Sequence, residues 1–180
     1  MARLRKAVSY RRLERPYTRV SKFNELSYVR GRPVSKVVHY NMGELRATFG
    51  YSLFLKAKSS LQIRDSAIES ARQTSNRFLE EKLGKNGYRV TIRMYPHHVL
   101  RENPLASGAG ADRMSTGMAR SFGKPIGVAA RVHQNQVMFQ VDVNKEHLDV
   151  AKRALMRASY KLPCSCFIEV AQNKAENKKE

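Results

Sequence analysis

The sequence is short of acidic residues, cysteine and long apolar runs, and each shortage excludes a class of protein. Only 15 Asp and Glu stand against 34 Lys and Arg in 180 residues. Two cysteines, Cys164 and Cys166, are too few and too close together for a disulfide framework, so we expect reduced thiols. No apolar run has the length of a signal peptide or a membrane span. We therefore expect a cytoplasmic protein, or a nuclear one if the cell has a nucleus, without a membrane partner.

The net charge of +19 predicts a polyanionic partner. A surface this basic repels itself, which costs stability unless a polyanion neutralises it. The phosphate backbone of a nucleic acid is the commonest such partner, because each neutralised phosphate releases counterions. Solubility alone requires only about 2–8 net charges in a small domain. An anionic membrane is a weaker candidate, since no segment combines a basic face with a bulky apolar face.

The most basic part of the chain is its first fifth, residues 1–36, where eleven Lys and Arg stand against two Glu. Aromatic residues are interleaved with these charges without a sustained helical or strand period. Such a segment cannot bury a core of its own, so we expect it to become ordered on RNA, with arginine on phosphate and aromatic rings on bases. A solvated tail is the alternative. The predicted RNA contacts in this arm are Arg3, Arg5, Lys6, Arg11, Arg12, Arg15, Arg19, Lys22, Arg30 and Arg32.

The remainder has the hydrophobic periodicity of one α+β domain. We expect strands at residues 37–42, 50–56, 88–95 and 167–170, and a hairpin of strands 126–133 and 137–143 joined across residues 134–136. One helix is expected to be capped by Asp65 and ended by Gly84, and a second to be capped by Asn144. This pattern predicts a two-layer sandwich, in which two helices pack on a mostly antiparallel sheet. The predicted organisation is a basic arm (1–36), a core domain (37–172) containing a long loop (97–125), and a polar tail (173–180).

The long loop is the candidate functional segment, because a loop of this length inside a compact domain is usually functional or disordered. Residues 107–111 have almost no side-chain bulk, so their backbone could approach a phosphate or a base closely. A flexible surface loop without a function is the alternative. The loop and its flanks add predicted RNA contacts at Arg93, His97, His98, Arg120, Lys124 and Arg131.

The sequence contains no complete motif for catalysis or metal binding. The glycines at 117 and 123 are one residue too far apart for a phosphate-binding P-loop, and Pro125 replaces the Mg²⁺-binding hydroxyl residue. Cys164 and Cys166 have no second pair to complete a zinc site. His97 and His98 are adjacent in a strand-like run, so their side chains should point to opposite faces. Because no nucleophile–base pair is indicated, we expect neither an enzyme nor a cofactor.

Several runs resemble the large-subunit ribosomal protein family called L-ten-e in archaea and eukaryotes and L-sixteen in bacteria. They cover residues 88–96, 110–114 (Gly-Ala-Asp-Arg-Met), 117–118, 122–125 (Phe-Gly-Lys-Pro), 130–132 and 148–163. The resemblance extends from about residue 37 to residue 170 and is weaker in the arm. The tail length and the central loop favour the archaeal branch.

The resemblance implies a structural protein that binds large-subunit rRNA near the 5S rRNA and the central protuberance, beside neighbouring ribosomal proteins. The family's long loop extends towards the peptidyl transferase centre and the path of tRNA between the A and P sites. Its role there is positioning, since RNA catalyses peptide transfer. On this chain the matching loop residues are Arg101, Ser107, Gly108, Ala109, Gly110, Ala111, Asp112, Arg113 and Met114.

Two other classes of function remain open at the level of sequence. A free RNA chaperone or RNA-processing factor would be equally basic, and it would bind many RNAs. An enzyme acting on RNA or nucleotides would need an acid–base or metal pair converging in the loop. The charge supports the ribosomal protein and the chaperone equally, and the resemblance favours the first.

Overall fold

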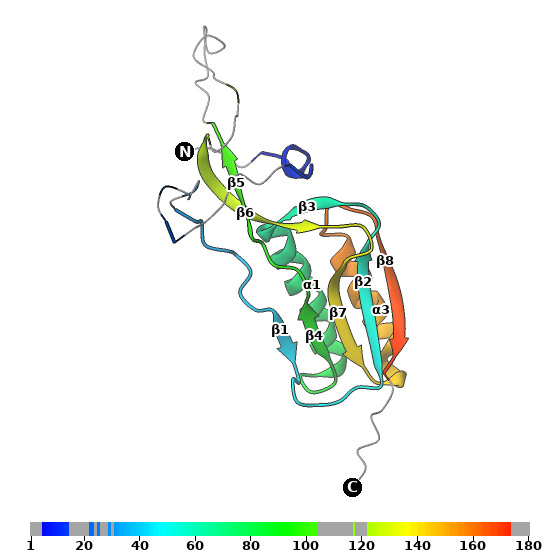
Figure 1. The fold of residues 1–180 in the computed structure, drawn as a ribbon. Helices are drawn as coiled ribbons and strands as arrows, with labels where there is room; N and C mark the ends of the chain where they lie inside the picture. The colour runs from blue at the N-terminus through cyan, green and yellow to red at the C-terminus, as the bar shows by residue number, and fades with distance from the viewer. Residues whose placement is uncertain are drawn as a thin grey trace.

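A computed structural model describes residues 5–14, 22–23, 25, 29, 31–103, 117 and 122–173. Within them the chain forms eight strands in two antiparallel sheets, two α-helices and short 3₁₀ turns (Figure 1). This confirms the predicted α+β class. The division of the strands between two sheets was not predicted.

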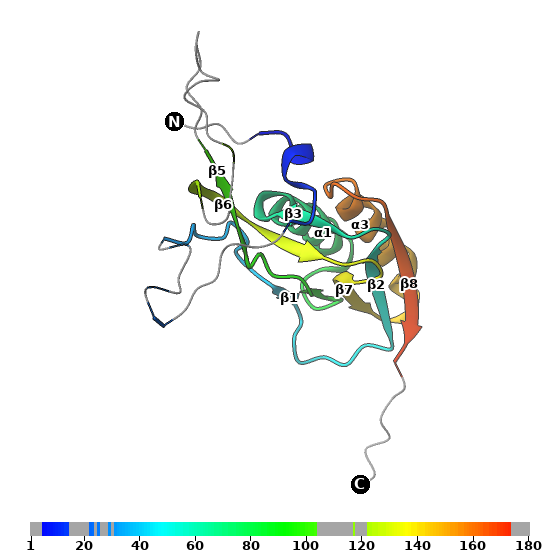
Figure 2. The same ribbon diagram turned by 45° about the horizontal axis from the view of Figure 1, so that its top comes forward.

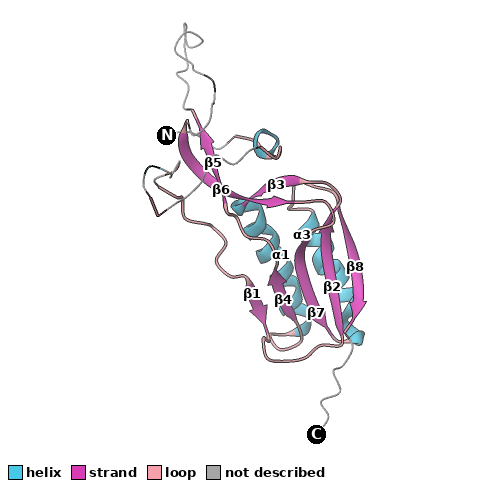
Figure 3. Cartoon of the chain, in the orientation of Figure 1, coloured by secondary structure: helices cyan, strands magenta, loops and turns pink. Residues whose placement is uncertain are grey.

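The main sheet has five strands in the order β1-β4-β7-β2-β8. Both helices lie against it, side by side (Figure 3). Its elements are β1 (Asn41–Gly43), β4 (Arg89–Ile92), β7 (Val137–Val143), β2 (Tyr51–Ala57) and β8 (Cys166–Gln172), with α1 (Asp65–Leu83) and α3 (Leu148–Ser159). Neither helix in the described part is long and apolar enough to cross a membrane.

One hydrophobic core lies between this sheet and the helices. The alternating strand positions Leu53 and Leu55 on β2 are buried, as are Ile68 and Leu79 on one stripe of α1 and Leu155 on α3. The two periods, two in strands and 3.6 in helices, bring these side chains to the shared interface. The core thus forms where the sequence pattern predicted it.

A second sheet of three strands, in the order β3-β6-β5, projects from one end of this body (Figures 1 and 2). We call it the small sheet. Its strands are β3 (Leu61–Arg64), β6 (Lys124–Val132) and β5 (His98–Glu102). Ala130 and Val132 of β6 are buried in the main core, which joins the two sheets through one long strand.

The predicted hairpin of residues 126–133 and 137–143 is wrong, because β6 and β7 belong to different sheets. The turn between them does form, with Asn135 at a φ of 62°, a conformation that Asn tolerates better than most residues. The backbone of this turn is hydrogen-bonded to the end of β2. The Asn135 N–H donates to the Ala57 carbonyl at 2.8 Å, and the Ala57 N–H donates to the Gln136 carbonyl at 3.2 Å. The chain therefore passes from the small sheet to the main sheet at this turn.

The boundaries of several other elements differ from the prediction. The first strand is Asn41–Gly43 rather than 37–42, and the predicted loop 97–125 contains β5 and the start of β6. Asp65 is the first helical residue rather than the cap, and His147 rather than Asn144 precedes α3, after a 3₁₀ turn at Lys145–His147. Gly84 ends α1 as predicted, at a φ of 70°.

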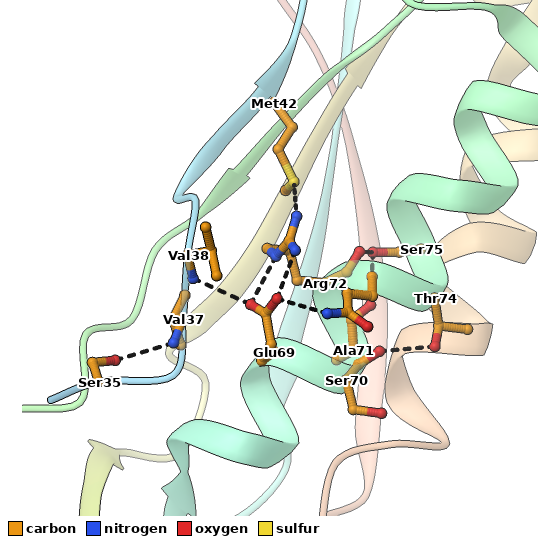
Figure 4. A network of polar contacts seen from close by, with 11 residues as sticks. Ser35, Val37, Val38, Met42, Glu69, Ser70, Ala71, Arg72, Thr74 and Ser75 are labelled. Carbon is orange, nitrogen blue, oxygen red and sulfur yellow. Dashed lines mark hydrogen bonds and ion pairs between the residues drawn. The ribbon is translucent and has the colours of Figure 1, made fainter.

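Carboxylates on α1 hold the segment that leads from the arm into β1. The Asp65 carboxylate accepts hydrogen bonds from the backbone N–H groups of Lys36 (3.0 Å) and Ser66 (2.8 Å). One turn later, the Glu69 carboxylate accepts from the Val38 N–H at 3.3 Å and from the Arg72 guanidinium at 2.6 and 2.8 Å (Figure 4). Since Val37 and Val38 make no strand ladder, these side chains replace the missing strand pairing.

Candidate nucleic-acid interface

The described part of the basic arm is folded against β3. Residues 7–10 form a 3₁₀ turn, η1. The Gln62 N–H donates to the Arg11 carbonyl at 2.9 Å, and the Gln62 side-chain amide donates to the Arg12 carbonyl at 2.5 Å. The Arg64 guanidinium donates to the Arg5 carbonyl at 2.9 Å. In this stretch β3 supplies donors for the carbonyls of the arm, a contact that the sequence did not predict.

This docking uses the backbone of the arm and leaves its charges at the surface. Lys6, Arg11 and Arg12 are exposed. Anchored carbonyls with exposed guanidinium groups form a preordered basic surface, which loses less conformational entropy on binding than a flexible tail.

Arg5 differs from these residues because it has an acidic partner. Its Nε lies 2.5 Å from Oε1 of Glu102 on β5. The Tyr10 hydroxyl donates to the other Glu102 oxygen at 3.3 Å, and the Arg64 guanidinium lies 5.6 Å from the centre of the Tyr10 ring. Arg5 thus joins the arm to the small sheet, and part of its charge is compensated there.

His98, Arg131 and Gln62 lie on one face of the small sheet. Gln62 is opposite Arg131 in the β3–β6 register, and His98 is opposite Ala129, two residues before Arg131. Because residues two apart on a strand share a face, the three side chains project to the same side. Each contributes a buried polar atom without a hydrogen-bond partner: Nδ1 of His98, Nε of Arg131 and Oε1 of Gln62. Such atoms are uncommon in folded proteins.

His98 is neutral in this setting. Burial, followed by the positive charges of Arg131 and Arg101, lowers the pKa of its imidazole to about 4. At neutral pH it cannot contact phosphate as a cation, and any RNA contact that it makes is an uncharged hydrogen bond. His97, by contrast, is exposed, so the two histidines point to opposite faces as predicted.

The small sheet also holds both ends of the predicted functional loop. Arg101 pairs with Pro125 and Glu102 with Lys124 across β5 and β6, so the chain leaves and re-enters at neighbouring points. An Arg101 guanidinium nitrogen also donates to the Phe122 carbonyl on the returning side. Lys124 is exposed at this base. The intervening segment is therefore an insertion between two adjacent antiparallel strands.

Some predicted contacts lie outside the described residues. They are Arg3, Arg15, Arg19, Arg30, Arg120, Ser107, Gly108, Ala109, Gly110, Ala111, Asp112, Arg113 and Met114. Of the remaining predicted contacts, Arg32, Arg93 and Lys22 are exposed. Arg32 lies beside the ring of Tyr95, and Arg93 precedes that tyrosine by two residues.

Sequence reasoning counted Tyr10 among the aromatic residues of the arm, but it did not predict that Tyr10, Gln62 and Arg64 hold the arm against the small sheet. They hold the arm in place, yet each is an ordinary residue in a short segment, and their contacts cross from one part of the chain to another. The aromatic residue inside the basic arm is the one local signal for Tyr10. Nothing local indicates the other two.

Within the described residues, no group of three or more His, Cys, Asp or Glu side chains could hold a metal ion. Cys164 and Cys166 are free thiols whose sulfur atoms lie 3.6 Å apart.

Comparison with known proteins gives the family. Residues 13–169 match the family model described as ribosomal protein L16p/L10e. A Methanococcus maripaludis protein named large ribosomal subunit protein uL16 is 46% identical over 172 residues, which is 95% of this chain and 96% of that protein. Proteins of the same name from Archaeoglobus fulgidus (45% over 161 residues, 89% of each chain) and Methanococcus aeolicus (44% over 170 residues, 94% of this chain and 95% of that protein) are similarly close.

These matches cover almost the whole chain, include most of the basic arm, and come from archaea, the branch that the sequence favoured. The runs that carried the resemblance lie inside the matched region. The chain belongs to the ribosomal protein L16p/L10e family.

Proposed function

We propose that this chain is a structural component of the large ribosomal subunit that binds large-subunit rRNA through its arm and small sheet. The observation that carries the proposal is the docking of the arm on β3, which fixes the backbone at Arg11 and Arg12 and leaves both guanidinium groups exposed. Phosphate contacts from such groups position a protein on RNA without selecting a sequence. The net charge of +19 and the family membership support the same partner.

In its finer form, the proposal locates the protein beside the 5S rRNA and the central protuberance. The loop from Arg101 to Met114 extends towards the peptidyl transferase centre and helps position tRNA between the A and P sites. The antiparallel pair β5–β6 supports this, because it holds the two ends of the loop at neighbouring points of the small sheet. Arg120, Lys124 and Arg131 are the proposed basic contacts on the returning side.

The role assigned to the protein is positioning rather than catalysis. A positioning protein must hold RNA in one geometry. A rigid sheet with a preordered basic arm is suited to that role. Its partners are then rRNA, tRNA and neighbouring ribosomal proteins, and it acts on the ribosome in the cytoplasm.

Co-sedimentation tests the proposal. The tagged full-length chain, expressed in an archaeal host, should migrate with large subunits through a gradient at moderate salt. The matched control is an unrelated basic protein of similar size and charge, which should leave the subunits when the salt is raised. A chain that stays at the top of the gradient and binds many RNAs equally would instead support the free RNA chaperone.

A further inference from the structure

A row of three aromatic side chains extends from the main core to the surface beside the small sheet. The rings of Tyr40 and Tyr95 are stacked, with centroids 5.2 Å apart and planes 25° apart. The His97 ring continues the row, 4.5 Å from Tyr95 and tilted by 45°. We call Tyr40, Tyr95 and His97 the aromatic row.

Backbone hydrogen bonds hold the row in place. The Ile92 N–H donates to the Tyr40 carbonyl at 2.8 Å, which fixes Tyr40 beside the end of β4. The His97 N–H donates to the Tyr95 carbonyl at 2.9 Å and closes a three-residue turn centred on Pro96. Proline has a fixed φ near the value that such a turn needs. The two outer rings are therefore positioned by a stiff backbone.

Exposure increases along the row. Tyr40 is partly buried and packs against the main core. Tyr95 is 44% exposed, and His97 is also exposed. Packing against the core accounts for the position of the Tyr40 ring. It does not account for the exposed rings of Tyr95 and His97. Adjacent aromatic rings held at a surface are what proteins use to stack unpaired bases of RNA.

The surroundings of the row are basic. The Arg32 guanidinium lies 5.8 Å from the centre of the Tyr95 ring and donates to the Pro96 carbonyl at 2.9 Å. Arg93, two residues before Tyr95, is exposed. Neither of the two segments that carry the row, residues 31–43 and 89–101, contains an Asp or Glu.

The α1 carboxylates that bond the segment leading to Tyr40 are already engaged. Asp65 accepts bonds from two backbone N–H groups, and Glu69 is paired with Arg72. With these two carboxylates engaged, arginine beside an aromatic surface is suited to the phosphate of the nucleotide whose base is stacked.

We infer that the aromatic row is a stacking platform for an unpaired base of RNA, with Arg32 and Arg93 contacting the adjoining phosphates. The inference rests on the proposed binding of rRNA and adds a defined subsite to it. A docking surface for a neighbouring protein is the competing explanation.

The chain contains no tryptophan, so Tyr95→Trp introduces a single fluorescent reporter into the platform. Stacking of a base on the indole should quench its emission when protein-free large-subunit rRNA or a single-stranded oligonucleotide is added. Double-stranded RNA of the same length should quench it much less, because its bases are already stacked. An unchanged emission with every RNA would overturn the inference.

Affinity measurements with the full chain separate stacking from charge. Tyr95→Ala should weaken binding to the single-stranded oligonucleotide by about tenfold and leave the log–log salt slope unchanged, since a ring releases no counterions. Tyr95→Phe keeps the ring and should bind like the wild type. Arg32→Gln should instead lower the log–log salt slope by about the amount that one phosphate contact contributes.

A matched control is Tyr160→Ala, which removes a tyrosine that is 74% exposed beyond the end of α3 and should not change binding.

Equal affinities for Tyr95→Ala and the wild type, with full binding of rRNA by both, would overturn the platform and leave the proposed function intact. Failure of all variants and the wild type to bind rRNA would overturn the proposed function. If the indole emission of the Tyr95→Trp variant responds only to a ribosomal protein, the competing explanation is established.

Discussion

The Nε atom of Arg89 on β4 lies 2.8 Å from Oδ2 of Asp142, its register partner on β7. The Asp142 carboxylate has no exposed surface, and its other oxygen accepts a 2.5 Å hydrogen bond from Ser52, its partner on β2. One buried charge thus links three neighbouring strands of the main sheet. Removal of Asp142 would leave the Arg89 guanidinium without this charged partner.

We predict that Asp142→Ala destabilises the fold by about 3 kcal/mol, because it removes the charged partner of the partly buried Arg89 guanidinium and an acceptor of the Ser52 hydroxyl and the Gln140 amide. Urea unfolding followed by circular dichroism would measure this change. Asp149→Ala, which removes an exposed carboxylate from α3, is the matched control and should change the unfolding midpoint little. A midpoint for Asp142→Ala equal to that of the control would contradict the assigned role.

Gly43→Ala should also destabilise the protein. Gly43 has a φ of 81°, and an added Cβ would lie 2.2 Å from the carbonyl oxygen of Tyr88, the residue before β4. Strain and overlap together predict a loss of more than ~1 kcal/mol. Gly50→Ala is the control, since its Cβ would meet nothing within 4 Å. Similar melting temperatures for the two variants would argue against this geometry.

Acid should weaken the attachment of the β1 segment to α1. The hydrogen bonds from Arg72 lower the pKa of Glu69 from 4.5 to about 2. A carboxylate with a lowered pKa in the folded state contributes stability that is fully present above pH 4.5 and lost as the pH falls towards 2. We therefore predict that Glu69→Gln is less stable than the wild type at neutral pH and that the difference shrinks on acidification.

The measurement is the free energy of unfolding in urea, from neutral pH down to the lowest pH at which the chain stays folded. Glu81→Gln, which changes an exposed carboxylate on the same helix, controls for the removal of charge. A stability difference between Glu69→Gln and the wild type that is constant with pH would show that the ion pair contributes nothing in this range.

Much of the main sheet and both helices are predictable, because their patterns are local. Leu53 and Leu55 alternate on β2, and the apolar stripe of α1 recurs every three or four residues. The small sheet is not predictable in this way. Three successive residues of β5, His98 to Leu100, are buried, so no alternation marks the strand, and β3 runs directly into α1 without a turn.

Local sequence patterns also could not predict which strands pair with each other. Residues 134–136 form the expected turn, yet the strands on either side pair elsewhere, since Ala57 offers the competing backbone bonds. The candidate interface could likewise be predicted only in part. Charge identified Arg11 and Arg12, whereas the Gln62 contacts that fix them depend on the tertiary fold.

Neutralising the exposed guanidinium groups of the arm should reduce the salt dependence of rRNA binding. With Arg11→Gln and Arg12→Gln combined, we expect the log–log slope to fall by about 0.9 for each phosphate that the arm no longer neutralises. The measurement is filter binding of large-subunit rRNA over a range of salt concentrations. Replacement of Lys152 and Arg153 on α3 by Gln removes the same charge from another surface and is the control. Identical slopes for both double variants would mean that the arm contacts no phosphate.

Deletion of residues 107–111 should impair translation without unfolding the protein. The proposal gives these residues a role in tRNA positioning, and β5 and β6 hold the ends of the loop independently of them. We expect a melting temperature near that of the wild type and a polysome profile with fewer heavy polysomes. Arg113→Gln, which keeps the loop length, should act in the same direction. A wild-type polysome profile for both variants would reject the role of the loop.

The docking of residues 11 and 12 against β3 has a consequence for the free protein. An uncovered strand edge can pair with the edge of another molecule and start aggregation. The arm occupies part of that edge with its own carbonyls and surrounds it with like charges, which repel a second copy. Between synthesis and incorporation into its complex, the chain therefore carries its own protection against self-association, and a truncated copy without the arm would be the more prone to precipitate.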